Sequence, residues 1–381
     1  MVTGILLEPL PERRVSLLPE QAETLTKKNI TVLLESDTGL QAGFPNNAYA
    51  TKGITVAIRN EILQKADLIL SIHPLTDADI KLLKTGCILM GIYQPLYKYL
   101  LMQQWAAKSL TTFSLDMIPR TTRAQSMDVL SSQANIAGYK AVLQAASIYP
   151  KYFPMLMTAA GSITPAKVLI LGAGVAGLQA VATARRLGAV VEVFDTRPAV
   201  KEEVMSLGAK FVEVEGAADA SKAGGYAVEQ TDEYKLKQQQ RIAEAAAKAD
   251  VIISTAQIPG KPAPVLITED MIKSMKYGSV IIDLAAATGG NTAKTVNAQT
   301  VKYNGVTIVG DSNLASSVPG DASKMYGKNV LNFLQLIVTK TGDINLNFED
   351  DIVKGTCITH NGVVVSDRVK TLLQAFESVG H

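Results

Sequence analysis

Cysteine and histidine are scarce in this chain of 381 residues, which has two cysteines and three histidines. Cys87 and Cys357 show no metal-binding or redox spacing, and so few thiols in a chain of this length suggest a reducing compartment. The histidines, His73, His360 and His381, are scattered along the chain. We therefore expect no metal site.

Three further absences restrict the partners. No basic segment followed by an apolar run opens the chain, so we expect no secretory signal. No apolar run has the length needed to cross a bilayer. The formal net charge is only +2, which gives no reason to expect nucleic acid or a strongly anionic surface as partner. We expect a chain that is soluble by itself, although it could dock on a membrane protein.

A strand–helix–strand pattern occupies the middle of the chain. Residues 168–171 form an apolar run of strand length, and residues 175–187 predict a helix that ends at Gly188. A second strand is predicted over residues 190–194 and is followed by Asp195. This arrangement is the setting in which a dinucleotide-binding glycine motif functions.

Three glycines between the first strand and the helix have G-x-G-x-x-G spacing. Gly172 permits a tight turn, Gly174 lets the backbone approach a pyrophosphate, and Gly177 lets the helix pack close to the sheet. The pyrophosphate would also meet free N–H groups and the positive end of the helix dipole at Val175 and Ala176. An ordinary glycine turn is the alternative for the motif alone, but the surrounding strands, helix and acid favour dinucleotide binding.

The acid at the end of the second strand predicts which dinucleotide is bound. Asp195 is correctly spaced to accept hydrogen bonds from the adenosine ribose, and its carboxylate would repel a 2′-phosphate. NAD(H) is therefore favoured over NADP(H). Arg197 lies two residues later and would soften this preference. Together with Thr196, these residues complete the predicted nucleotide-binding turn.

Alternating strands and helices on both sides of the fingerprint predict an α/β fold of two Rossmann-like domains with doubly wound, mostly parallel sheets. Asp77 is the expected N-cap of one of the helices. The predicted strands cover residues 30–34, 54–57, 68–72, 87–92, 210–214, 251–254, 280–284 and 306–309. The predicted helices include residues 60–66, 77–83 and 199–207.

Two long helix patterns, residues 133–149 and 321–338, are expected to link the domains. The second would return the chain to the first domain, where an Asn361-Gly362 hairpin is predicted. The pattern breaks over residues 215–240, a polar stretch that is either a mobile functional loop or a plain solvated loop. The expected domains are a composite α/β domain of residues 1–131 plus 320–381 and an NAD(H)-binding domain of residues 132–319.

Residues 117–139, MIPRTTRAQSMDVLSSQANIAGY, closely resemble the nicotinamide-contacting loop of the NAD(H)-binding component of proton-translocating nicotinamide nucleotide transhydrogenase. Alanine dehydrogenase shares that family's fold and is the natural alternative. The resemblance extends over nearly the whole chain. Its other matching stretches are residues 172–179, 223–226, 258–268, 278–285 and 328–334.

The resemblance implies roles for four residues of this loop. Arg120 and Asp128 would hold the carboxamide end of the nicotinamide, with Ser131 helping, and Gln125 would reach toward the NADP(H) of a partner component. Without the resemblance, Arg120 and Asp128 would fit a surface ion pair equally well, and Gln125 and Ser131 would be structural.

The resemblance also implies further nucleotide contacts. Gly225, Tyr226 and Gln238 match positions in or beside a mobile loop that closes over bound nucleotide in that family. Gln257 departs from the family pattern, in which an apolar residue at this position lies over the adenine.

Hydride transfer between two nicotinamide C4 atoms protonates and deprotonates nothing, so it needs no acid, base or nucleophile. An alanine dehydrogenase needs an acid/base and cationic substrate ligands. The family's acid would fall at or near Ala287, its substrate lysine near Leu70 or Ser71, and its histidine near Tyr93. Arg14 remains. These losses argue against an amino-acid dehydrogenase.

The resemblance thus implies the NAD(H)-binding component of a transhydrogenase of the Si-to-Re stereospecific type, with its other components on separate polypeptides. It would pass hydride from NADH to NADP⁺ on a partner subunit, coupled to proton translocation by membrane-spanning subunits. The expected state is a homodimer in the cytoplasm, peripheral on the inner membrane. A non-catalytic nucleotide sensor is the other alternative, because the chain holds only one nucleotide fingerprint.

Overall fold

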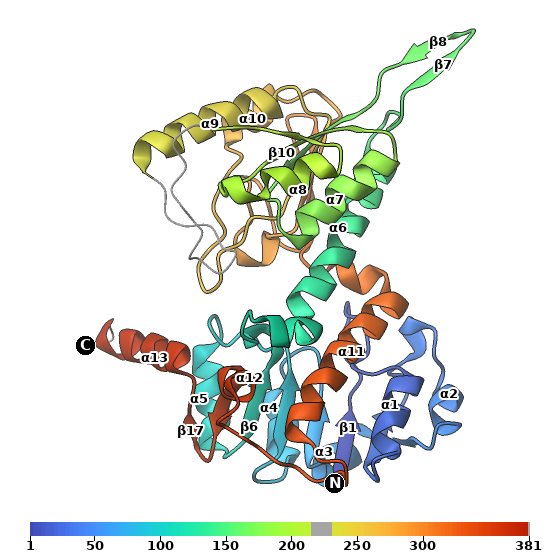
Figure 1. Ribbon diagram of the computed structural model, residues 1–381, viewed down its shortest axis with the longest axis vertical. Coiled ribbons are helices and arrows are strands. Elements are labelled where there is room, and N and C mark those ends of the chain that lie inside the picture. Colours follow the sequence, from blue (N-terminus) through green and yellow to red (C-terminus); the bar gives the residue numbers. More distant parts are fainter. Residues whose placement is uncertain (215–230, 380–381) are drawn as a thin grey trace. The chain divides into compact units, whose positions relative to one another are not determined.

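The computed structural model describes residues 1–214 and 231–379, which form two compact units (Figure 1). The first unit consists of Met1–Gln133 and Ser316–His381, and the second of Ala134–Ala315. Each unit is built on its own mostly parallel sheet, so the predicted fold class is confirmed.

The first unit contains an eight-stranded sheet with the order β17-β16-β6-β5-β4-β1-β2-β3. The strands from β6 to β3 pair in parallel, whereas β16 and β17 are antiparallel. The strands are β1 (Val2–Ile5), β2 (Thr31–Glu35), β3 (Thr55–Ala57), β4 (Leu68–Leu70), β5 (Ile88–Gly91), β6 (Thr111–Ser114), β16 (Cys357–His360) and β17 (Val363–Val364).

Strands β1 and β6 were not predicted from the sequence, because neither is a simple apolar run. In β1, a Cβ on Gly4 would lie 2.4 Å from the side chain of Ile62, so glycine allows the covering helix to approach. In β6, polar residues are buried beside hydroxyl partners from distant strands. The hydroxyl of Thr359, for example, lies 2.9 Å from that of Thr112.

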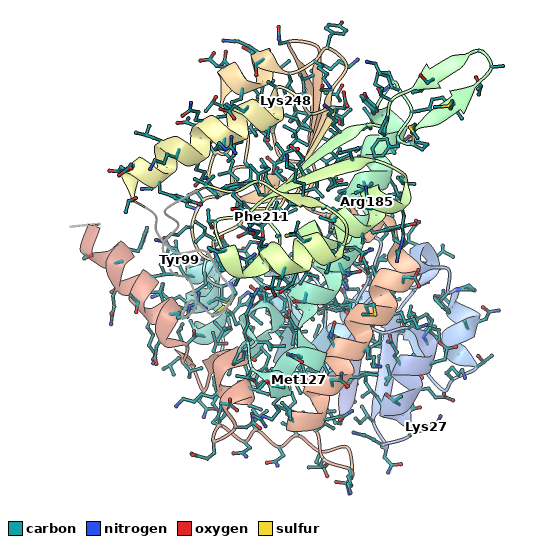
Figure 2. The ribbon with its side chains drawn as sticks, turned by 45° about the horizontal axis from the view of Figure 1, so that its top comes forward. Lys27, Tyr99, Met127, Arg185, Phe211 and Lys248 are labelled. Carbon is teal, nitrogen blue, oxygen red and sulfur yellow. The ribbon has the colours of Figure 1, made fainter. Side chains whose placement is uncertain are left out.

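Helices cover both faces of this sheet (Figure 1). One core contains side chains of α1 and α11, including Phe333, while the other contains side chains of α3 and α5, including Trp105. Met127 (Figure 2) is buried in the first core. The helices are α1 (Pro19–Thr26), α2 (Asn46–Ala50), α3 (Arg59–Lys65), α4 (Asp77–Leu82), α5 (Tyr99–Ala107), α11 (Pro319–Ile337), α12 (Asp351–Thr356) and α13 (Asp367–Val379).

Two local predictions in this unit have different outcomes. The hairpin is confirmed, since β16 and β17 pair around Asn361 and Gly362, whose φ angles are 48° and 82°. The predicted N-cap Asp77 is wrong. Thr76 caps α4, because its backbone is extended while Asp77 is already helical, and its hydroxyl accepts from the N–H of Asp79 at 3.2 Å.

The second unit contains a seven-stranded sheet with the order β11-β10-β9-β12-β13-β15-β14, parallel except at β14. The first six strands follow the doubly wound dinucleotide-binding order. They are joined by an edge strand, β14, that the sequence did not predict. The strands are β9 (Lys167–Leu171), β10 (Val190–Phe194), β11 (Lys210–Phe211), β12 (Val251–Ser254), β13 (Val280–Asp283), β14 (Gln299–Tyr303) and β15 (Val306–Gly310).

Helices also cover both faces of the second sheet. Side chains of α6 and α7 pack on one face and those of α9 and α10 on the other. Phe211 (Figure 2) packs against the first of these cores. The helices are α6 (Val129–Ile148), which begins before the boundary between the units, α7 (Val175–Arg186), α8 (Lys201–Ser206), α9 (Asp232–Ala246) and α10 (Glu269–Ser274).

The polar stretch predicted as a loop up to residue 240 is partly helical. Thr231 caps α9 by accepting from the backbone N–H of Tyr234 at 3.2 Å, and the helix runs from Asp232. Tyr234 and Ile242 are buried on its inner face, so a mostly polar sequence still forms an amphipathic helix. Among the described residues, no helix combines the length and apolar character needed to cross a membrane.

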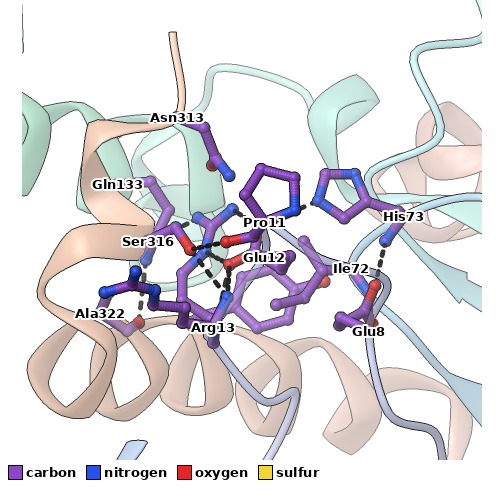
Figure 3. Close-up of polar contacts among 12 residues, drawn as sticks. Glu8, Pro11, Glu12, Arg13, Ile72, His73, Gln133, Asn313, Ser316 and Ala322 are labelled. Carbon is purple, nitrogen blue, oxygen red and sulfur yellow. Dashed lines mark hydrogen bonds and ion pairs between the residues drawn. The ribbon is translucent and has the colours of Figure 1, made fainter. Parts of the chain in front are cut away.

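A buried charge network lies at the carboxyl ends of β1 and β4 (Figure 3). Glu12 accepts two bonds from the guanidinium of Arg14, at 2.8 and 2.6 Å, and lies 2.9 Å from Nε2 of His73. The Arg14 guanidinium also donates to Gln133 at 2.8 Å. Nearby, Glu8 accepts from the backbone N–H groups of Ile72 and His73.

The two carboxylates of this network shift in opposite directions. Burial alone would raise the pKa of Glu12, but hydrogen bonds from Arg14 and His73 and the charge of Arg14 outweigh it and lower that pKa. Burial dominates at Glu8, whose pKa rises to about 7 despite its two backbone donors. Glu12 is therefore the ionised partner of Arg14, and the pair is buried as a unit.

We predict that Arg14→Met lowers the free energy of unfolding by about 3–5 kcal/mol, because it leaves the Glu12 carboxylate buried without its guanidinium partner. Urea unfolding followed by circular dichroism measures this loss. The control is Glu12→Gln/Arg14→Met, which removes both charges and should recover at least half of it. An Arg14→Met variant as stable as the parent chain would contradict the prediction.

Candidate functional site

The predicted glycine motif forms the turn from β9 into α7. Gly172 has a φ of 99°, which a side chain would strain. A Cβ on Gly177 would lie 1.8 Å from the carbonyl oxygen of Gly172, so only glycine allows the first turn of α7 to approach the end of β9. Gly174 is the N-cap of α7, and within the described part of the chain, apart from its chain neighbours, no atom lies within 4 Å of where its Cβ would be. This open side is where a phosphate group would approach.

Helix α6 packs closely against the start of α7. A Cβ on Gly138 would lie 2.0 Å from the carbonyl oxygen of Ala176, so α6 requires glycine at this point. Val175, beside Ala176 in the first turn, remains 41% exposed. The sequence prediction assigned no role to Gly138, although a glycine inside a long helix pattern was a usable signal.

Asp195 ties the end of β10 to the glycine turn. Its Oδ2 accepts from the backbone N–H of Ala173 at 2.7 Å and from Nη2 of Arg197 at 2.9 Å. Its Oδ1 accepts from the backbone N–H and the Nε of Arg197, at 2.8 and 2.9 Å. The hydrogen bonds that the Arg197 side chain donates to Asp195 are the largest cause of the raised pKa of Arg197. Thr196, between the two, is partly exposed.

The remaining predicted nucleotide contacts lie in two places. Gln257 follows β12, is exposed, and donates to the carbonyl oxygen of Leu284 at 3.2 Å. Gln238 is partly exposed on α9. Gly225 and Tyr226 lie outside the described residues.

Asn291, which the sequence prediction missed, holds the loop that contains Gln257. Its side chain donates to the carbonyl oxygens of Ala256 and Pro264 at 2.9 and 2.8 Å and accepts from the N–H of Ala256 at 3.1 Å. Asn291 is itself fixed by Asp283, which accepts from its backbone N–H. These partners are distant in sequence, so no local pattern revealed them.

The predicted nicotinamide loop lies in the first unit, as the 3-10 turn Thr122–Met127 followed by α6. Asp128 caps α6: its Oδ1 accepts from the backbone N–H of Ser131 at 2.9 Å and its Oδ2 from the Ser131 hydroxyl at 2.6 Å. Asp128 is partly exposed and Ser131 is partly exposed as well. The structure thus brings these two predicted residues into direct contact.

The other two predicted loop residues, Arg120 and Gln125, are exposed. Gln125 belongs to the 3-10 turn, whose neighbouring residues Ala124 and Met127 are buried in the core. Their burial holds the turn down while Gln125 remains at the surface. A buried pair flanking an exposed amide is suited to presenting that amide to another molecule.

Helices from much later in the chain hold this loop. The side chains of Asn329 and Asn332 on α11 both donate to the carbonyl oxygen of Ser126 at 2.8 Å. Arg123 forms a two-pronged ion pair with Asp350, the N-cap of α12. The sequence prediction missed these anchors. Together they give an exposed loop a defined backbone position.

The positions predicted for an amino-acid dehydrogenase do not carry its chemistry. Ser71 is buried with its hydroxyl 3.0 Å from that of Tyr93, which is fully buried. Ala287 is exposed and uncharged. Asp283 is the carboxylate nearest to it in the sequence, but it is buried and accepts from two backbone N–H groups and from the hydroxyl of Thr295. It is therefore a structural acceptor.

Comparisons with known proteins cover both units. The family described as alanine dehydrogenase/PNT, N-terminal domain, matches residues 4–137, and its C-terminal domain matches residues 141–367. The first portion of NAD(P) transhydrogenase subunit alpha from Rickettsia prowazekii is 43% identical over 373 residues, which cover 97% of this chain and 96% of that protein. Alanine dehydrogenase of Bacillus subtilis is 25% identical over 366 residues, 94% of this chain and 90% of that protein.

A solved structure of a transhydrogenase from Sinorhizobium meliloti matches this chain with a TM-score of 0.87 and 42% sequence identity. The match covers 96% of this chain and 100% of that chain. The predicted resemblance is confirmed. The chain belongs to the alanine dehydrogenase/PNT family, and within it to the proteins that form the first portion of NAD(P) transhydrogenase subunit alpha.

Proposed function

We propose that this chain binds NADH and passes its hydride to NADP⁺ held by a partner subunit, in an assembly that couples the transfer to proton translocation. The observation that carries the proposal is the exposed loop with Arg120, Gln125, Asp128 and Ser131, in which Asp128 and Ser131 are already bonded to each other. The names of the chain's relatives support the reaction class.

The nucleotide's adenosine end would bind at the glycine turn. The pyrophosphate would approach the open side of Gly174 and the first turn of α7, where helix N–H groups and the dipole favour an anion. Asp195 would face the adenosine ribose, with Thr196 and Arg197 beside it. Gln238 and Gln257 are proposed contacts at the edge of this site, together with Gly225 and Tyr226, which lie outside the described residues.

The loop residues would hold the nicotinamide end. Arg120 and Asp128, with Ser131, would fix the carboxamide and its ribose by hydrogen bonds. Gln125, exposed between buried Ala124 and Met127, would reach the partner's NADP(H). None of these side chains needs to exchange a proton, so the rate would come from placing the two rings face to face at near-attack distance.

A membrane partner would supply proton translocation, and this chain would lie on the cytoplasmic face of the inner membrane through its partner subunits. The chain's relatives are named as one portion of a subunit alpha, which supports partners on separate polypeptides.

We propose that the chain is a homodimer in which the β7–β8 hairpin (Leu156–Thr158 and Gly161–Ile163) packs on a second copy. The hairpin is a separate two-stranded sheet that extends away from the seven-stranded sheet of its unit (Figure 1), and a two-stranded hairpin is marginal in water by itself. Met155 and Met157, at its start, are 64% and 75% exposed, and Leu156 and Ile163 are exposed as well. Such an apolar arm is typical of a contact with another protein surface.

The first test removes the charge of Asp128 while keeping its cap. Asparagine caps helices as well as aspartate does, so Asp128→Asn should fold normally. We expect this variant and Arg120→Ala to lower hydride transfer at least tenfold in a stopped-flow assay with a purified NADP(H)-binding partner. NADH affinity should change less than about tenfold, because the adenosine end supplies most of the binding.

The control for this test is Arg368→Ala, which removes an exposed arginine of α13. Full rates in both loop variants would refute the loop assignment. A parent chain that binds NADH but transfers no hydride with its partner would favour a nucleotide sensor instead.

The second test concerns the alternative reaction. Mixing the chain with alanine and NAD⁺, or with pyruvate, ammonia and NADH, should give no change in absorbance at the nicotinamide band. The physical reason is that Ser71, Tyr93 and Ala287 supply neither a cation nor an acid/base to a substrate. Measurable turnover would restore an amino-acid dehydrogenase.

The third test concerns the hairpin. Met155→Asp/Met157→Asp places two charges on the exposed apolar arm and should convert the dimer to a monomer in light scattering, with the thermal unfolding of the units unchanged. The matched control, Met205→Asp, charges another exposed methionine, on α8. A dimer that survives the double substitution would place the contact elsewhere.

A further inference from the structure

The carboxylate of Asp195 is fully used within the chain. A carboxylate has about four acceptor positions, and Asp195 accepts four hydrogen bonds, one from Ala173 and three from Arg197. Two of the donors are backbone N–H groups, which are fixed by the turn. The other two belong to the guanidinium of the Arg197 side chain.

The Asp195–Arg197 pair is shielded from water. The Asp195 side chain is 7% exposed and that of Arg197 is 18% exposed. The guanidinium and carboxylate meet through two prongs, each of 2.9 Å. A pair with this geometry and burial is stronger than an ordinary surface ion pair and defines where the guanidinium lies.

The position of this arginine matters because of the fold. Both residues follow the end of β10, beside the glycine turn, where this class of sheet receives the adenosine ribose. An arginine at that place is the group that accommodates a 2′-phosphate in NADP-binding relatives of the fold, and guanidinium is well matched to phosphate oxygens. Here the same side chain is turned onto a carboxylate.

We propose that Arg197 is a latent ligand for a 2′-phosphate and that Asp195 selects NAD(H) mainly by occupying it. In this view the carboxylate does two things: it repels the phosphate and it withholds the guanidinium of Arg197, a cation that would bind the phosphate. Removing the carboxylate alone takes away the acceptor of Nε and Nη2 of Arg197 and creates a phosphate site at these two donors. The inference rests on the proposed binding of NAD(H) at this turn, but it does not depend on hydride transfer.

A second carboxylate also acts on the Arg197 guanidinium. Glu203 on α8 acts on Arg197 through its charge. Glu203 and a 2′-phosphate would therefore compete for Arg197 once the Asp195 carboxylate is removed. Adding Glu203→Gln to Asp195→Asn should increase the affinity for NADPH further.

The experiment measures NADH and NADPH binding to the full-length chain by nucleotide fluorescence, with no partner subunit. The parent chain should prefer NADH. Asp195→Asn keeps an acceptor oxygen for the Ala173 N–H and should bind NADPH about tenfold more tightly than the parent, as expected for a new charge-assisted contact. ADP, which lacks the 2′-phosphate, should bind the variant and the parent alike.

Two double variants decide whether Asp195 acts by occupying Arg197 or by repelling the phosphate. Asp195→Asn/Arg197→Gln should lose the gain in NADPH affinity, and Asp195→Asn/Arg197→Lys should keep some of it, because lysine supplies charge without the fork. If Asp195→Asn/Arg197→Gln binds NADPH as tightly as Asp195→Asn, simple repulsion explains the preference and the proposal is overturned.

Two readouts separate this inference from other failures. A purely structural role of Arg197 would weaken ADP, NADH and NADPH together, whereas the proposal moves NADPH alone, so a common loss would refute it. Asp195→Ser repeats the test if the asparagine variant does not fold. A parent chain that binds neither NADH nor NADPH would overturn the proposed function and this inference together, whereas failed hydride transfer with normal titrations would overturn only the function.

Discussion

The close backbone contact at the start of helix α7 is the constraint on which the nucleotide-binding unit depends. The first turn of α7 lies against the end of β9 at Gly177 and against α6 at Gly138, with no room for a Cβ at either point. This double contact orients the helix N-terminus toward the edge of the sheet where parallel strands end. Asp195 is tied to that turn directly, because it accepts from the backbone N–H of Ala173.

The loop proposed to hold the nicotinamide is supported in a different way. It is exposed, yet its backbone is held by buried Met127 and by two asparagine amides, Asn329 and Asn332, that meet at one carbonyl oxygen. Asp128 and Ser131 then fix each other through a helix cap. A site that needs orientation without proton transfer is well served by polar residues on such a rigid support. The Glu12–Arg14 pair, by contrast, is buried inside its unit.

Repetitive local patterns made much of the fold predictable. Apolar runs correctly predicted β9, β10, β12, β13 and β15, and the glycine spacing predicted the turn between β9 and α7. Strand β6 was missed because its buried threonines are satisfied by a strand more than two hundred residues later. The first turns of α9 were missed because its composition is polar, although one face of the helix is buried. Asp77 was misassigned because capping depends on which residue has extended backbone angles.

By itself, the sequence determined the two α/β sheets, the glycine turn and the absence of acid–base groups at the amino-acid dehydrogenase positions. Each of these features depends on which residue types occur at short spacings along the chain. Only the tertiary structure decided how those residues are engaged. It showed that the Asp195 carboxylate accepts hydrogen bonds from Arg197 and Ala173, that Asn291 holds the loop of Gln257, and that α11 holds the Thr122–Met127 turn. The reason is physical: a hydrogen bond depends on distance and direction in space, and partners separated by many residues leave no periodic trace in the chain.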